Sequence, residues 1–376
     1  MKFSTSSATL REALMTVNGA VPSKSTLPIL ECILFERDGD ALRLSATDLE
    51  ISIVERVPVQ FESNGAPKGN RVAVPAKRLL DTLRALPDLP IEFASDDDFG
   101  VLLRTDQGRY KMVGHDGADY PALPELDGEQ RIETEGALLK RAIQKTSFAV
   151  SKDALRPAMM GIYFQIQPEQ GRTVATDGHR LVKLTMEGLS APEPVNFIVP
   201  EKAMTLAGRV ATDGACTIRV DGGHVAFEFE HARVLARLID EAYPNYEAVI
   251  PVENDRQLVV NRTAMLAAVK RVGLYSSSMT NQIRLALEPN QIEISAEDIE
   301  RASEAKETVL CDYDSEPMVI GFNSIYLTEV LSNLDAEEVR FEFSSPNRAG
   351  VVTPLDQQDG EEMLMLIMPV MLNTYA

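Results

Sequence analysis

The chain has no tryptophan, three cysteines and four histidines among its 376 residues, and these shortages exclude several kinds of site. Cys32, Cys216 and Cys311 are odd in number and far apart, which predicts reduced thiols and no disulfide framework. No CxxC or HExxH spacing occurs, so we expect no metal site and no cofactor. GxSxG and P-loop motifs are also missing, which argues against the common hydrolase and nucleotide-binding sites.

Long apolar runs are missing too. No stretch approaches the roughly 18 apolar residues of a membrane-spanning helix. The first six residues, MKFSTS, lack the apolar segment of a secretory signal. We therefore expect a cytoplasmic protein without a membrane partner.

What the sequence does contain is one pattern written three times. The motifs are ATDLEISI from Ala46, ATDGHRLV from Ala175 and AEDIERAS from Ala296, at steps of 129 and 121 residues. The Tyr-Pro pair at Tyr120 recurs at Tyr243. A period this long is the size of a whole domain rather than of a solenoid repeat. The chain is therefore predicted to hold three tandem copies of one domain.

Each third carries two amphipathic helix patterns with apolar residues at i, i+4 and i+7. We expect Ser7 to mark the start of the first helix, Pro75 and Pro200 to lie in first turns, and Asn323 to cap the last helix. The predicted helices cover residues 7–18, 75–86, 135–147, 201–210, 261–273 and 323–334.

Between these helices lie short runs of alternating polarity, such as 42–45, 51–53, 225–229 and 339–343. Period-two alternation with tight connections predicts antiparallel strands. The fold class is therefore α+β, with two helices packed on one side of an antiparallel sheet in each domain. We place the domains at residues 1–125, 126–252 and 253–376, with boundaries near Glu125–Gly128 and Pro251–Asn254.

The charge is distributed unevenly. The chain carries a formal net charge of −20, which taken alone argues against a nucleic-acid partner. The six predicted helices, however, hold twelve Lys and Arg against five Asp and Glu. Helices favour Glu as readily as Lys, so propensity alone does not account for this surplus. If the helices face one way, they form a basic lining suited to sequence-independent contact with a duplex backbone.

Three other functions have to be considered. Asp177 and His179 suggest a hydrolase in which a histidine acts as the general base and a nearby carboxylate assists it. The same Ala-x-Asp triplet recurs at Ala46 and Ala296 without a histidine, however, which favours a structural role for Asp48, Asp177 and Asp298 in fixing a turn. A sequence-specific DNA regulator lacks a helix-turn-helix or zinc-finger signature. A scaffold that binds DNA on its surface, without reading sequence and without encircling the duplex as a ring, is the remaining alternative.

The whole chain resembles the bacterial DNA polymerase sliding clamp, the β subunit of the replicative DNA polymerase III holoenzyme. The resemblance is carried by ATDGHRLV, by the segments TLPIL from Thr26, DYP from Asp119 and AYPNY from Ala242, and by GFN from Gly321 and IMPVML from Ile367. It implies a crescent protomer of three clamp domains, joined head to tail with a second copy into a homodimeric ring around duplex DNA. It also implies a non-catalytic processivity factor that needs a separate ATP-driven loader.

The resemblance implies a pocket for short apolar linear motifs between the second and third domains. The implied partners are the polymerase α subunit, the clamp-loader δ subunit, other polymerases and repair proteins. The side chains suit an adaptable apolar groove. The pocket residues are Met159, Thr176, Gly178, His179, Arg180, Leu181, Pro244, Val249, Leu366, Ile367, Met368, Pro369, Val370, Met371 and Leu372.

Two departures from the family pattern concern the charge at the pocket edge. Met371 stands where a basic residue is common, and Glu247-Ala248 replaces a common basic pair. We therefore expect motif binding to depend less on acidic flanking residues than in related clamps.

The DNA contacts combine positions matched to the family with the helix cations. The expected set is Lys24, Lys77, Arg78, Lys140, Arg141, Lys145, Lys152, Arg156, Lys202, Arg209, Lys270 and Arg271. For the dimer joint, Leu274 and Tyr275 match apolar contact positions, with ordinary core packing as the alternative.

Overall fold

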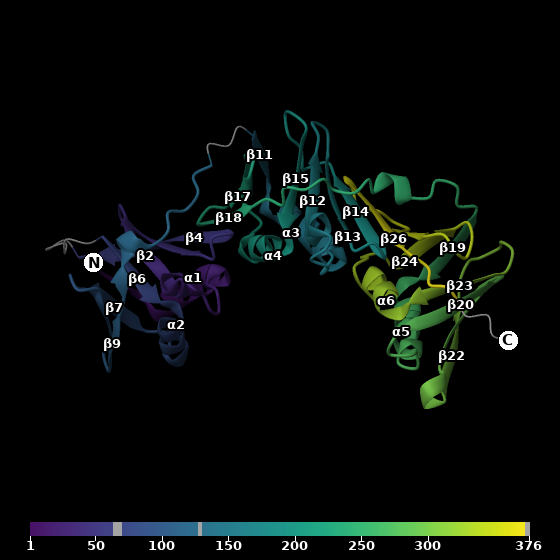
Figure 1. The fold of residues 1–376 in the computed structure, drawn as a ribbon, viewed down its shortest axis with the longest axis horizontal. Coiled ribbons are helices and arrows are strands. Elements are labelled where there is room, and N and C mark those ends of the chain that lie inside the picture. Colours follow the sequence, from purple (N-terminus) through teal and green to yellow (C-terminus); the bar gives the residue numbers. More distant parts are fainter. Residues whose placement is uncertain (63–69, 127–129, 373–376) are drawn as a thin grey trace. The chain divides into compact units, whose positions relative to one another are not determined.

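The computed structural model describes residues 1–62, 70–126 and 130–372. This part of the chain forms two compact units. The first contains Met1–Lys140 and Lys202–Leu238, and the second contains Arg141–Glu201 and the residues from Ile239 onward. Figure 1 shows the helices and strands in chain order. The six predicted helices are confirmed as α1 (Ser7–Val17), α2 (Ala76–Ala85), α3 (Gly136–Thr146), α4 (Glu201–Val210), α5 (Arg262–Gly273) and α6 (Ser324–Ser332).

The first unit contains two antiparallel sheets, as the alternating runs predict. The smaller has the order β5 (Gln60–Phe61), β1 (Lys2–Ser6), β7 (Pro90–Ser95), β8 (Gly100–Arg104) and β9 (Arg109–Val113). The larger has the order β10 (His115–Asp116), β6 (Arg71–Pro75), β2 (Cys32–Asp38), β3 (Ala41–Thr47), β4 (Ile51–Pro58), β18 (Ala232–Arg237), β17 (His224–Glu228), β16 (Ala215–Val220) and β11 (Gln130–Glu135).

The second unit also contains two antiparallel sheets. One has the order β15 (Val195–Pro200), β12 (Gly161–Ile166), β13 (Gly171–Thr176), β14 (Arg180–Met186), β26 (Glu361–Ile367), β25 (Gly350–Pro354), β24 (Glu338–Phe343) and β19 (Arg256–Asn261). The other has the order β22 (Ser303–Leu310), β21 (Gln291–Asp298), β20 (Gln282–Glu288) and β23 (Met318–Asn323).

Two strand pairs cross from one sequence repeat to the next. β4 of the first repeat pairs with β18 of the second, and β14 of the second pairs with β26 of the third. Each long sheet is therefore built from two consecutive repeats. Because hydrogen-bonded strands keep these halves together, the compact units do not coincide with the repeats.

The helices cover these sheets with their apolar stripes. α1 buries Leu10, Leu14 and Val17 and lies against β4. α5 buries Met265, Val269 and Val272 and contacts β22 and α6. Burying each such side chain contributes roughly 1.5–3 kcal/mol. Phe3 on β1 and Phe93 on β7 belong to the smaller sheet and Phe35 on β2 to the larger one, and their fully buried rings stack with centroid distances of 4.8 and 5.0 Å.

The structure corrects three predictions about where the helices begin. Ser6, not Ser7, caps α1 by accepting a hydrogen bond from Thr9 N, while the buried Ser7 hydroxyl donates to Pro87 O. Pro75 and Pro200 end strands directly before α2 and α4 rather than lying inside the helices. The prediction for Asn323 is confirmed, because its Oδ1 accepts from the backbone N–H groups of Ile325 and Tyr326.

Candidate functional site

A cavity of about 590 Å³ lies in the second unit. Its walls come from the β13–β14 turn, the segment 244–251, the β24–β25 connection and the end of β26. Nine of the predicted pocket residues line it: Met159, Thr176, Gly178, Arg180, Leu181, Pro244, Val249, Leu366 and Met368. Ala248, which the sequence placed at the pocket edge, also lines it, whereas the sequence reasoning missed Asn245, Tyr246, Ile250, Pro251, Asn347, Arg348 and Ala349.

The turn that forms one wall is held by local hydrogen bonds. Asp177 Oδ1 accepts from the backbone N–H groups of His179 and Arg180 at 2.9 and 3.0 Å. The Thr176 hydroxyl donates to Arg180 O at 2.7 Å and accepts from Gly178 N at 3.1 Å. Gly178 has φ +87°, a conformation that favours glycine. These bonds fix the backbone that the cavity exposes.

The same turn recurs in the other repeats, as the triplet predicts. Asp48 Oδ1 accepts from the N–H groups of Glu50 and Ile51, and Asp298 Oδ1 accepts from that of Arg301. The structural interpretation of the three aspartates is therefore confirmed. Asp177 uses its carboxylate on the backbone, and the His179 ring stacks on Tyr326 with centroids 5.6 Å apart. Asp177 therefore fixes a turn and His179 packs on a ring, so the two side chains are not arranged as a carboxylate and a general base that activate a nucleophile.

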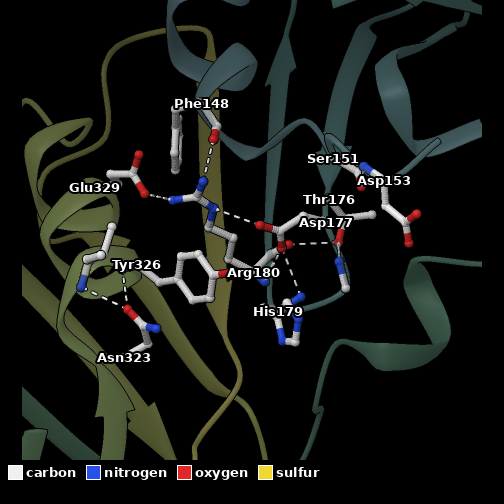
Figure 2. A network of polar contacts seen from close by, with 12 residues as sticks. Phe148, Ser151, Asp153, Thr176, Asp177, His179, Arg180, Asn323, Tyr326 and Glu329 are labelled. Carbon is white, nitrogen blue, oxygen red and sulfur yellow. Dashed lines mark hydrogen bonds and ion pairs between the residues drawn. The ribbon is translucent and has the colours of Figure 1, made fainter. Parts of the chain in front are cut away.

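Arg180 holds this wall to α6 (Figure 2). Its guanidinium pairs with Glu329, lies 3.3 Å from Asp177 Oδ2 and donates to Phe148 O at 2.6 Å. The Tyr326 ring lies 4.8 Å from it. The residue is 8% exposed. A buried charge of this kind needs partners, and two carboxylates supply them. Arg180 therefore shapes the cavity while its charge is neutralised within the protein.

The remaining predicted pocket residues lie beside the cavity rather than in its lining. Met368 N donates to His179 O, and Val370 N donates to Gly321 O. Ile367 is fully buried in β26, whereas Met371 is 82% exposed. Pro369 and Leu372 belong to the same segment after β26, which therefore lies along β23.

Two of the predicted DNA-binding cations take part in an ion-pair network inside the second unit. Lys145 Nζ donates to Asp335 Oδ1 at 2.6 Å and to Asn333 O at 2.9 Å. Arg141 lies 2.5 Å from Glu361 and 3.0 Å from Asp335. The hydrogen bond that Arg141 Nε donates to Glu361 raises the pKa of Arg141. Burial raises the pKa of Asp335, but the hydrogen bonds from Lys145 and Arg141 outweigh it, so the net pKa is lowered. Both cations therefore stabilise the end of α6.

Other predicted cations are exposed, and four of them already pair with carboxylates. These pairs are Lys152–Glu201, Arg156–Asp153, Lys202–Asp48 and Arg271–Glu307. Lys140 is half-buried. Of the predicted DNA-binding cations, the exposed ones without an ion-pair partner among the described residues are Lys24, Lys77, Arg78, Arg209 and Lys270.

The two predicted dimer residues are on the surface. Leu274 is 81% exposed and Tyr275 is 45% exposed, so ordinary core packing does not explain them. A second cavity, of about 730 Å³, lies in the first unit. It is lined by Pro75, Lys77, Arg78, Asp81, Thr82, Ala85, Leu86 and Tyr110. The sequence reasoning did not predict this cavity.

Within the described residues, no group of three or more His, Cys, Asp or Glu side chains could hold a metal ion. None of the helices in that part of the chain is long and apolar enough to cross a membrane.

Comparison with known proteins covers the whole chain. Models of the N-terminal, central and C-terminal domains of the DNA polymerase III beta subunit match residues 1–124, 133–245 and 247–370. The beta sliding clamp of Caulobacter vibrioides is 33% identical over 370 residues, 95% of this chain and 97% of that protein. That of Synechococcus elongatus is 30% identical, covering 97% and 98%.

A solved structure agrees. The DnaN sliding clamp of Pseudomonas aeruginosa, bound to griselimycin, superposes with a TM-score of 0.92 at 30% identity, covering 99% of this chain and 100% of that one. Three consecutive family matches confirm the three tandem clamp domains and the α+β fold class. The chain therefore belongs to the DNA polymerase III beta subunit family, the beta sliding clamps, which are non-catalytic processivity factors.

Proposed function

We propose that this DNA sliding clamp works as a head-to-tail homodimeric ring, with separate surfaces for the second copy, for duplex DNA and for partner motifs. The full-length family match carries the function itself. The assignment of individual residues to the three surfaces rests on the contacts described above and on the internal repeat.

The repeat predicts the joint between the two copies. In both long sheets, the strand after the Ala-x-Asp turn pairs with the last strand of the following repeat: β4 with β18, and β14 with β26. In the third repeat, the strand after the Ala-x-Asp turn is β22, and it lies at a free sheet edge. In the first repeat, the last strand of the smaller sheet is β9, and it also lies at a free edge. We infer that β22 of one copy pairs with β9 of the other.

The ladders also give the register of this pairing. Opposite the motif alanines Ala46, Ala175 and Ala296 lie Ile53, Val182 and Ala305. Ile53 pairs with Val234, and Val182 pairs with Met365. In each repeat, a path can be followed across the sheet from one cross-strand partner to the next, starting at the residue four positions before the first helix. This path ends at Val234 in the second repeat, at Met365 in the third and at Tyr110 in the first. The predicted partner of Ala305 is therefore Tyr110 of the second copy.

The cavity that Tyr110 lines supports the same joint. Counted from the helix starts, Leu274 corresponds to Gly19, just after α1. Gly19 packs so closely on Leu206 of α4 that a Cβ there would lie 2.4 Å from Leu206 Cδ2. Leu206 corresponds to Asp81 of α2, which lines the second cavity. We infer that Leu274 and Tyr275 fill this cavity of the second copy.

For DNA, we propose that the exposed predicted cations and the half-buried Lys140 contact phosphates without reading sequence. The candidates are Lys24, Lys77, Arg78, Lys140, Lys152, Arg156, Lys202, Arg209, Lys270 and Arg271. Arg141 and Lys145 act indirectly, because their charges are engaged by Asp335 and Glu361. Encirclement makes tight contacts unnecessary, and weak phosphate attraction permits sliding.

For partners, we propose that the 590 Å³ cavity and the segment 367–372 bind short apolar motifs of the polymerase α subunit, the clamp-loader δ subunit, other polymerases and repair proteins. Methionine at positions 159 and 368 suits a groove that accepts related sequences. Tethering converts each rebinding of the polymerase into an intramolecular event at high effective concentration.

The cytoplasmic location and the domain limits at 125/126 and 252/253 remain predictions. Residues 127–129, within the first predicted boundary, lie outside the described residues.

DNA topology provides the decisive test. The protein is loaded by a clamp loader onto nicked circular DNA, half of the sample is linearised, and both halves pass through a sizing column. Retention on circles with loss from linear DNA is the expected result. Equal retention on both would mean contact binding, and the ring would have to be abandoned.

A further inference from the structure

Arg348 places a positive charge on the wall of the proposed motif-binding cavity. The family pattern did not predict this charge. It lines the cavity from the β24–β25 connection, together with Asn347 and Ala349. Arg348 N donates to Ser345 O at 3.2 Å, and the Ser345 hydroxyl bonds Asn347 Oδ1 at 2.7 Å. At Gly350, a Cβ would lie 2.8 Å from the Phe343 ring, so the backbone packs closely where β25 begins. The turn therefore holds the exposed Arg348 at a defined place on the cavity wall.

The other charged lining residue is already engaged. Only Arg180 and Arg348 carry a charge among the lining residues, and Arg180 is neutralised by Glu329 and Asp177. Arg348 has no ion-pair partner among residues 1–62, 70–126 and 130–372. Nearby, Glu247 pairs with Arg172 at 3.1 Å, and neither residue lines the cavity. Arg348 is thus the single uncommitted charge in the described lining.

We propose that Arg348 determines specificity by pairing with a carboxylate that flanks the apolar core of a bound motif. This inference rests on the proposed function of the cavity as a motif-binding site. A guanidinium presents a planar fork that matches a carboxylate in two parallel hydrogen bonds. The remaining lining is uncharged, with Leu181, Tyr246 and Leu366 among its apolar members, so it offers a carboxylate no competing cation except the neutralised Arg180.

This proposal revises the expected independence from acidic flanks. That expectation followed from Met371 and Glu247-Ala248 at the positions of common basic residues. Arg348 comes from a different segment, so it restores a positive charge from another wall of the cavity. The carboxylate can come from an Asp or Glu side chain or from the C-terminus of the partner.

The test uses three fluorescent peptides that share one apolar core: one neutral and amidated, one amidated with an Asp flank, and one with a free C-terminal carboxylate. Anisotropy titrations give Kd for the full-length protein and for Arg348→Gln. We expect the variant to weaken at least one carboxylate peptide about 3- to 10-fold and to leave the neutral peptide within about twofold. The peptide that loses affinity identifies the source of the carboxylate. Arg172→Gln is the matched control and should change none of the three values.

A second variant reverses the charge. Arg348→Glu should prefer a Lys-flanked peptide over the Asp-flanked one, the opposite of the unmodified protein. Equal losses for all peptides in Arg348→Gln, or no loss for any, would overturn the role of Arg348 while leaving the motif site intact. Failure of every peptide to bind the unmodified protein would instead overturn the assignment of the cavity.

Discussion

Lys145 Nζ lies 2.6 Å from Asp335 Oδ1, across 190 residues of sequence. The same ammonium donates to Asn333 O at the C-terminal end of α6, where carbonyl groups lack partners within the helix. A positive charge at this end also interacts favourably with the helix dipole. Lys145 therefore joins α3 to the end of α6 through an electrostatic contact. The sequence had predicted that this lysine contacts DNA.

Replacing this lysine should lower stability. Lys145→Met removes one of the two cations that pair with Asp335 and the donor to Asn333 O, which should lower the free energy of unfolding by about 1–3 kcal/mol. Urea unfolding followed by circular dichroism measures the change. Lys140→Met, on the same helix, is the control and should stay within about 0.5 kcal/mol. Indistinguishable midpoints for the two variants would contradict the structural role of Lys145.

Glu55 should make stability depend on pH. Burial raises its pKa from 4.5 to about 7, Thr16 opposes the shift, and Glu12 adds to it. One carboxylate oxygen of Glu55 is buried without a hydrogen-bond partner. The folded protein therefore takes up a proton near pH 7, while the unfolded chain does so only near 4.5. The contribution of Glu55 to stability should rise as the pH falls between these values.

Glu55→Gln should remove that dependence. The variant should be more stable than the unmodified protein at about pH 8, by about 1–2 kcal/mol after allowance for solvent screening, and equal to it near pH 4.5. Denaturant unfolding across this range measures the difference. Glu92→Gln, which changes an exposed glutamate on β7, should leave the pH profile unaltered. A constant offset between Glu55→Gln and the unmodified protein at every pH would argue against titration of Glu55.

Gly178 should tolerate no side chain. Its φ of +87° disfavours other residues, and a Cβ would lie 2.8 Å from Arg156 Nη1. We expect Gly178→Ala to lower the free energy of unfolding by about 1 kcal/mol and to weaken motif binding, because a residue with a Cβ is strained at this φ and the turn must adjust, while the exposed Arg156 side chain can move aside. Thermal unfolding and peptide titration measure the two effects. Gly222→Ala places its Cβ in open space and should change neither. Unchanged affinity in Gly178→Ala would show that this wall does not contact the motif.

The register of the proposed joint can be tested by cross-linking. Facing residues on antiparallel strands have Cα atoms about 4.5–5.5 Å apart, which suits a disulfide. Tyr110→Cys combined with Ala305→Cys should therefore give covalently linked copies on a non-reducing gel after mild oxidation. Lys111→Cys combined with Ala305→Cys shifts the pair by one residue, which points the two side chains to opposite faces. Stronger cross-linking of the shifted pair would disprove the register.

The sequence predicted the elements whose determinants are local. Apolar stripes at helical spacing gave α1 to α6, and the repeated aspartates gave the three turns. The predicted position of the α1 cap was wrong by one residue, because Ser6 and Ser7 are both good capping residues. Only packing decides that the Ser7 side chain turns inward to Pro87.

Long-range partners could not be predicted in the same way. Whether Lys145 faces solvent or Asp335 depends on how α3 packs on the end of α6, which no local pattern encodes. Arg348 was missed for a related reason. It belongs to a connection between strands without a motif of its own, and it reaches the cavity only because β25 lies beside β26.

The two free sheet edges also affect how copies of the chain assemble. β9 and β22 are different strands, so the proposed pairing would use unlike surfaces on the two copies. Unlike surfaces produce a closed ring when the geometry allows the last edge to meet the first, and an open filament when it does not. Closure also protects edges that would otherwise recruit further chains. Substitutions that change how β4 pairs with β18, or β14 with β26, should therefore favour an open filament over the closed dimer without touching the edges themselves.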